Sequence, residues 1–272
     1  MRTVKGFCDT DEVNLYFETR GEGSCITLCN GTAMDTRVWD GQFSELSRCF
    51  RVVRYANRGS GRSGDTMGVP YRLQDDLKAL MDHLRIEKTI ASGVSVGGGI
   101  ALNFALDHPD HVAGLILMDP FMTGYTWPHI SPKMKTLAEH WKRKDVKQAA
   151  EVWYSMDWFS FLKKDEAKFE RFKRIVDDNV IRFFSRPFPP MEDWGKPMTE
   201  RLHQIHAPVL LLIGEHDTPD NREVVRIIER EVEGSTVVEV PMAGHMVNFE
   251  NPAFVNAAIV DFMRIVGSAI EA

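Results

Sequence analysis

The pentapeptide Gly93-Val94-Ser95-Val96-Gly97 constrains the fold of this chain more than any other segment. An apolar run ends near Ala91, just before it, and a helix-like stretch begins at Gly98, just after it. A serine between two such glycines, with a strand before it and a helix after it, forms a sharp turn that lifts its hydroxyl above a sheet. The turn strains the backbone and leaves little room for side chains on either side, which favours glycine at both positions. We therefore predict that Ser95 is a nucleophile; a glycine turn in some other α/β protein is the alternative.

Apolar runs and helical spacing alternate along much of the 272-residue chain. The predicted strands cover residues 13–18, 25–29, 51–55, 89–93, 112–118, 209–213 and 236–240. The predicted helices cover residues 39–46, 73–84, 98–106, 222–231 and 252–265. Strands that alternate with helices indicate an α/β fold with a mostly parallel, doubly wound sheet.

The alternation disappears between Pro120 and Pro197. This stretch is rich in Trp, Phe, Lys and Glu, and its pattern is typical of short helices. We expect residues 121–196 to form a helical cap inserted after the strand that ends at Met118, with residues 1–120 and 197–272 forming the core domain. The cap should cover the carboxyl edge of the sheet, where open α/β sheets bind ligands.

Two motifs late in the chain supply the other groups that an activated serine needs. Asp217 lies in Gly214-Glu215-His216-Asp217, directly after a predicted strand, and His245 follows the next strand in Gly244-His245-Met246. A histidine takes the proton of a serine best when an acid fixes its tautomer and orientation. The chain order Ser95, Asp217, His245 is that of α/β-hydrolases. Asp119, which also follows a strand, is the alternative acid, whereas Glu215 and Asp220 are expected to be solvated.

Backbone N–H groups must stabilise the oxyanion that forms during acyl transfer. We predict that Val96, directly after the nucleophile, supplies one and that Thr32 supplies the other, with Gly31 keeping the turn tight. Asn30 either bonds nearby backbone as a turn residue or places a polar group near the bound acyl oxygen. Arg58 is expected to brace the glycine-rich loop 57–64 and not to touch substrate.

The predicted cap is rich in aromatic side chains, including four of the six tryptophans of the chain. A small helical domain needs such residues for its own core, and this is the simpler interpretation of each one. Some of them should nevertheless line an apolar pocket above Ser95. Our candidates for substrate contact are Trp127, Trp153 and Trp158.

Composition excludes several classes of function. The net charge of −6 argues against a nucleic-acid partner. No apolar run approaches the ~18–20 residues of a membrane span, and the N-terminal residues lack an apolar signal segment, so we expect a cytoplasmic protein without membrane contact.

The four cysteines (Cys8, Cys25, Cys29 and Cys49) are expected to be buried, reduced thiols. No metal site and no cofactor are predicted, and the oligomeric state, including a homodimer, stays open.

The segments GVSVGG, GEHD and AGHMVNFENP resemble those of the α/β-hydrolase superfamily, and the resemblance covers nearly the whole chain. NGTAMDTRVWD and FRVVRYANRGSGRSG are similar to stretches of the 3-oxoadipate enol-lactonase and carboxylesterase-like group, in which an asparagine also opens the oxyanion loop. Two departures from many members are Asn30-Gly31-Thr32 in place of a His-Gly oxyanion loop, and Ala56 in place of the aspartate that opens an Asp-x-Arg-Gly-x-Gly loop. The likeness implies lactonase or esterase chemistry.

Three functional hypotheses follow. The first is a cofactor-free serine hydrolase that cleaves carboxylic esters or lactones through Ser95, His245 and Asp217. In the second, the same triad hydrolyses a carbon–carbon bond or performs lyase or cyclase chemistry, because a fold does not fix a function. In the third, the chain is a binding protein that kept the pocket.

Overall fold

A computed structural model describes residues 2–10, 12–65, 69–188 and 192–270. Its centre is a sheet with the strand order β1-β2-β4-β3-β5-β6-β7-β8. β2 pairs antiparallel with β1 and β4, and all the later neighbours are parallel. The strands are β1 (Val4–Asp9), β2 (Asn14–Arg20), β3 (Cys25–Cys29), β4 (Arg51–Tyr55), β5 (Thr89–Val94), β6 (Val112–Met118), β7 (Val209–Gly214) and β8 (Thr236–Val240).

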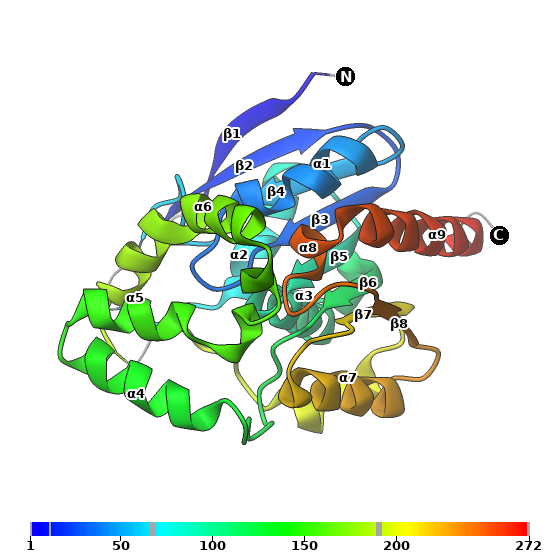
Figure 1. The fold of residues 1–272 in the computed structure, drawn as a ribbon. Helices are drawn as coiled ribbons and strands as arrows, with labels where there is room; N and C mark the ends of the chain where they lie inside the picture. Colours follow the sequence, from blue (N-terminus) through cyan, green and yellow to red (C-terminus); the bar gives the residue numbers. More distant parts are fainter. Residues whose placement is uncertain (1, 11, 66–68, 189–191, 271–272) are drawn as a thin grey trace.

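Helices cover both faces of this sheet (Figure 1). Because side chains alternate along a strand, Ile116 and Met118 of β6 pack into one hydrophobic core, whereas Leu115 and Leu117 pack into the other. The first core contains side chains of α1 and α9, and the second contains side chains of α2, α3 and α7. The bounds are α1 (Asp40–Leu46), α2 (Leu73–His83), α3 (Val96–Asp107), α7 (Pro219–Glu231), α8 (Val247–Glu250) and α9 (Pro252–Ile270).

Residues 121–196, which we call the cap segment, connect β6 to β7. They contain α4 (Ser131–Lys142), α5 (Val146–Tyr154) and α6 (Glu166–Phe184), which lie together on the side of the molecule away from α9 (Figure 1). Aromatic rings pack against one another inside it, with Trp153 contacting both Phe159 and Phe172. The expectation of short helices is wrong for α6, which has 19 residues.

The α/β class and the mostly parallel sheet are confirmed. The sequence analysis missed β1, an edge strand that carries Gly6 and has mostly exposed side chains. The thiols also differ from expectation, because Cys49 is exposed whereas Cys8, Cys25 and Cys29 are buried. Among the described helices, none is long and apolar enough to cross a membrane.

Candidate active site

Ser95 occupies the turn between β5 and α3. Its φ of 55° and ψ of −122° are unusual for a residue with a side chain. The peptide group is held from both sides, since the Ser95 N–H donates to the Met118 carbonyl (2.9 Å) and the Ser95 carbonyl accepts from Phe121 N–H (2.9 Å). This backbone pairing with the β6 end fixes the strained turn that the sequence predicts.

The two glycines around Ser95 are required by close backbone approach. A Cβ on Gly97 would lie 2.0 Å from the Cys29 carbonyl oxygen, and a Cβ on Gly93 would lie 2.1 Å from the Gly97 carbonyl. Helix α3 can therefore start directly against β3 and β5, which points its N-terminal N–H groups toward the region beside Ser95.

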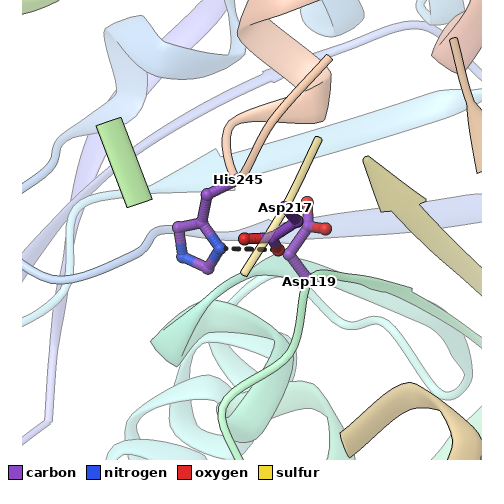
Figure 2. A group of neighbouring side chains, drawn as sticks. All are labelled: Asp119, Asp217 and His245. Atoms are coloured by element: carbon purple, nitrogen blue, oxygen red, sulfur yellow. Dashed lines mark hydrogen bonds and ion pairs between the residues drawn. The ribbon is translucent and has the colours of Figure 1, made fainter. Parts of the chain in front are cut away.

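His245 and Asp217 form a buried pair at the same edge of the sheet (Figure 2). The His245 Nδ1 lies 3.1 Å from the Asp217 Oδ2. Asp217 also accepts the Thr218 N–H through Oδ1 and the Asn221 side-chain amide, at 2.8 Å, through Oδ2. Burial alone would raise the pKa of Asp217, but the charge of His245 and these hydrogen bonds lower it below its usual range. Asp217 is therefore an anion suited to orient the histidine.

The sequence analysis missed two groups around this pair. Asn221 lies one helical turn after Asp217, in the first turn of α7, so its spacing could have indicated it. Glu250 is also buried, and its Oε2 accepts the N–H groups of Gly244 (2.8 Å) and Met246 (3.0 Å), the two neighbours of His245. Burial raises the pKa of Glu250 to about 7, although these N–H groups oppose the shift.

A cavity of about 280 Å³ joins these elements to the cap segment. Ser95, His245, Thr32 and Val96 border it from the core. The three candidate tryptophans, Trp127, Trp153 and Trp158, border it from the cap segment, together with Phe121, Thr126, Ile130, Ser131, Met134 and Phe159. The structure thus brings the predicted nucleophile, base, oxyanion residues and tryptophans to one cavity. Among the hydrogen bonds of the described residues, none joins Ser95 to His245. The distance between a nucleophile and its base is often long in enzymes without substrate.

Two residues predicted to contact substrate lie elsewhere. Asn30 and Gly31 are absent from the described lining of the cavity. The Asn30 side-chain amide instead donates to the Tyr55 carbonyl, and its own carbonyl accepts from Asn57. Asn30, directly after β3, is completely buried, and its side-chain nitrogen pairs with backbone.

The cap segment contacts His245, the predicted base, directly. The ring of Trp158, from the 3₁₀ turn Asp157–Phe159, stacks on the His245 ring with centroids 5.5 Å apart and planes 21° apart. Phe121 and Trp127 stack in the same way on another wall, 5.7 Å apart. Aromatic surfaces therefore enclose the histidine and much of the cavity.

Asp220 is not solvated, contrary to expectation. It is fully buried and accepts the N–H groups of His129 and Ile130, both at 3.0 Å, the His129 ring at 2.9 Å and the Tyr125 hydroxyl at 3.2 Å. These donors come from the start of the cap segment, whereas Asp220 comes from α7. Asp220 thus connects the cap segment to α7, and its partner Ile130 borders the cavity.

Asp119, Asp217 and His245 are the described residues whose ligand atoms could surround a metal ion, all lying within 4.8 Å of one another. Asp217 and His245 already satisfy each other by a hydrogen bond. The triad interpretation accounts for this pair without an ion.

The comparisons agree with this architecture. Residues 26–252 match the alpha/beta hydrolase fold family. RutD of Caulobacter sp. (strain K31), whose name is that of a proposed carbamate hydrolase, is 25% identical over 262 residues, covering 92% of this chain and 95% of its own.

Solved structures agree as well. A thermophilic esterase from Thermogutta terrifontis superposes with a TM-score of 0.81 and 28% identity, covering 98% of this chain and 99% of the other. The enol-lactonase from Burkholderia xenovorans LB400 has the same fold, with a TM-score of 0.77 at 23% identity and coverage of 95% and 100%. This chain therefore belongs to the α/β-hydrolase family of enzymes.

Proposed function

We propose that this enzyme is a serine hydrolase that cleaves uncharged, largely apolar carboxylic esters or lactones of small molecules. The observation that carries the proposal is the apolar cavity between Ser95 and His245 on one side and the cap aromatics on the other. Asp119 and His245 are its ionisable lining residues, and within the described chain no lysine or arginine borders it. A substrate carboxylate would lose its water there without gaining a cation, which is costly.

The proposed mechanism uses the predicted triad and the two predicted oxyanion N–H groups. The Ser95 oxygen attacks the ester carbonyl while His245 accepts the serine proton, and Asp217 stabilises the resulting imidazolium. The backbone N–H groups of Val96 and Thr32 stabilise the oxyanion. His245 then gives the proton to the leaving alkoxide, which departs as an alcohol. Water then hydrolyses the acyl-enzyme: His245 accepts a proton from the water as it attacks the acyl carbonyl, and returns that proton to the departing Ser95 oxygen. The chemistry needs no cofactor.

The test is labelling with a fluorophosphonate, followed by peptide mass spectrometry. We expect one adduct on Ser95 that is lost in Ser95→Ala and strongly reduced in His245→Ala. Turnover unchanged in Ser95→Ala would show that the mechanism is wrong. A well-folded protein without any adduct would instead favour a binding protein.

Substrate charge is tested with a matched pair of aryl esters, one with a neutral acyl chain and one whose chain of equal length ends in a carboxylate. We expect the neutral ester to have at least a ~10-fold higher kcat/KM, because the cavity offers no partner for the second charge. Equal values would contradict this assignment. Weak cleavage of both esters with rapid cleavage of a β-diketone would favour carbon–carbon bond hydrolysis.

A further inference from the structure

Asp119 lies beside Asp217 at the carboxyl edge of the sheet, and the close-up shows their carboxyl groups next to each other (Figure 2). The parallel pairing of β6 with β7 produces this neighbourhood, because the two strands end side by side. Asp119 N–H donates to the Leu212 carbonyl (3.0 Å), and Gly214 N–H donates to the Asp119 Oδ1 (3.1 Å). The backbone of β7 therefore fixes the Asp119 side chain against the triad acid.

The two carboxyl groups have very different surroundings. Asp217 receives hydrogen bonds from Thr218, Asn221 and His245. Asp119 is fully buried and receives one, on Oδ1, whereas its Oδ2 is buried and has no donor among the described residues. Two adjacent buried carboxylates cannot both keep a charge at low cost. Asp217, which receives more hydrogen bonds, is the ionised member of the pair. A proton on the Asp119 Oδ2 lets this oxygen donate a hydrogen bond.

We propose that Asp119 holds a proton and donates its O–H to Asp217, so that the triad acid is a pair of carboxyl groups with one negative charge. This inference rests on the proposed triad for its role in catalysis. Asp119 is then a positioning residue that acts through Asp217. Its O–H group fixes the orientation of the Asp217 carboxylate and partly neutralises the negative charge of that carboxylate. Its neighbours also include Glu250, a third buried carboxyl group.

Titration agrees with this geometry. Burial, and next the negative charge of Asp217, raise the pKa of Asp119 well above its usual value. Against the effect of burial, the charge and hydrogen bond of His245, and next the hydrogen bond with Asp119, lower the pKa of Asp217.

The pair also provides a reserve acid. In an Asp217→Asn variant the side chain at this position is neutral, so the repulsion by Asp217, which after burial is the main cause that keeps Asp119 protonated, disappears. Asp119 can then release its proton to solvent and present a carboxylate near His245, whose ring lies within the same 4.8 Å cluster. The amide of the variant would keep the volume of the original carboxyl group.

The first experiment detects the proton without any turnover. Infrared difference spectra at neutral pH compare the wild type with Asp119→Asn, and Glu250→Gln serves as the matched control for another buried carboxyl group. We expect a protonated-carboxyl C=O band in the wild type that Asp119→Asn removes and Glu250→Gln does not. Absence of a band assigned to Asp119 would overturn the proposal, even if Ser95 proves to be the nucleophile.

The second experiment uses kcat for a neutral aryl ester. Asp119→Asn should lose less activity than Asp119→Leu, because the amide still donates to Asp217. Asp217→Asn should lose ~10²-fold, and the double variant Asp119→Asn/Asp217→Asn should approach the ~10⁴-fold loss seen when a triad acid is replaced by its amide. A double variant as active as Asp217→Asn would contradict the reserve role. Absence of fluorophosphonate labelling in the wild type would reject the triad instead, and the infrared result would still stand.

Discussion

The indole ring of Trp158 lies nearly parallel to the imidazole ring of His245, with 5.5 Å between the ring centroids. Trp158 belongs to the cap segment and His245 to the core, so the stacking couples the position of the cap segment to the orientation of the His245 ring, the proposed base. The Trp158 indole N–H is buried and has no hydrogen-bond partner in the described part of the chain. Trp158 therefore contacts His245 through the face of its ring.

We expect Trp158→Leu to lower kcat/KM for a neutral aryl ester by about 3–10-fold, in line with the ~0.5–1.5 kcal/mol of an aromatic pair. Trp158→Phe should lose less, because it keeps a flat face over His245. Phe161→Leu is the matched control, since Phe161 comes from the same part of the cap but stacks on His216. Equal losses in Trp158→Leu and Phe161→Leu would argue against a specific role of the stacking.

Glu250 should make stability depend on pH. Its pKa is about 7 in the folded state against 4.5 for an ordinary glutamate, so between these values the folded protein binds more protons than the unfolded chain. The free energy of unfolding contributed by this group is therefore greatest below about pH 4.5 and falls by roughly 3 kcal/mol as the pH rises through 7.

Glu250→Gln isolates this contribution, because it removes the titration and keeps an oxygen for the Gly244 and Met246 N–H groups. Relative to the wild type, the variant should gain roughly 3 kcal/mol in free energy of unfolding between pH 4.5 and pH 8, measured with urea. The exposed Glu233→Gln is the surface control. A difference from the wild type that stays constant with pH would contradict the assignment.

Asp220→Ala should destabilise the protein by about 2–4 kcal/mol, because it leaves the His129 and Ile130 N–H groups without an acceptor. His129→Ala removes only an exposed ring from the same carboxylate and should cost less than ~1 kcal/mol. Urea unfolding of both variants measures the difference. Similar losses would mean that the backbone contacts do not anchor the cap segment.

Gly97→Ala should be among the most damaging small substitutions in the chain. Its Cβ would meet the Cys29 carbonyl oxygen at 2.0 Å, so helix α3 must move away from β3. We expect a loss of about 3 kcal/mol or more in the free energy of unfolding, together with weak fluorophosphonate labelling. The matched control is Gly114→Ala in β6, where the nearest atoms are 3.4 Å away and a loss under ~1 kcal/mol is expected. A stable, reactive Gly97→Ala would disprove the packing argument.

Local pattern was sufficient for the central strands and for the residues at their ends. β3, β4 and β6 have the predicted bounds, because each is a short, mostly apolar segment between turn residues. Parallel strands bring their carboxyl ends to one edge, so the amino-acid sequence alone is enough to expect Ser95, Asp217 and His245 close together. β1 carries no such run, and its existence depends on pairing with β2.

Contacts between distant segments could not be predicted from one sequence. Asp220 looks like an ordinary acidic residue in the first turn of a helix, and its donors lie about ninety residues earlier in the cap segment. The partner of Asn30 could not be predicted for the same reason, because it is the Tyr55 carbonyl on the neighbouring strand β4. The neighbourhood of Asp119 and Asp217 likewise comes from strand order, which no local motif specifies.

The burial of Asp220 has a consequence for exchanging parts between related enzymes. A cap segment grafted from another member would arrive with its own backbone donors at the entry, and it would fit only if α7 presents an acceptor at the matching position. Conversely, this cap would leave two N–H groups unpaired on a host that lacks the aspartate. The cap segment, which borders the cavity, thus depends on a residue of the C-terminal half, and chimaeras should transfer the cap segment and α7 together.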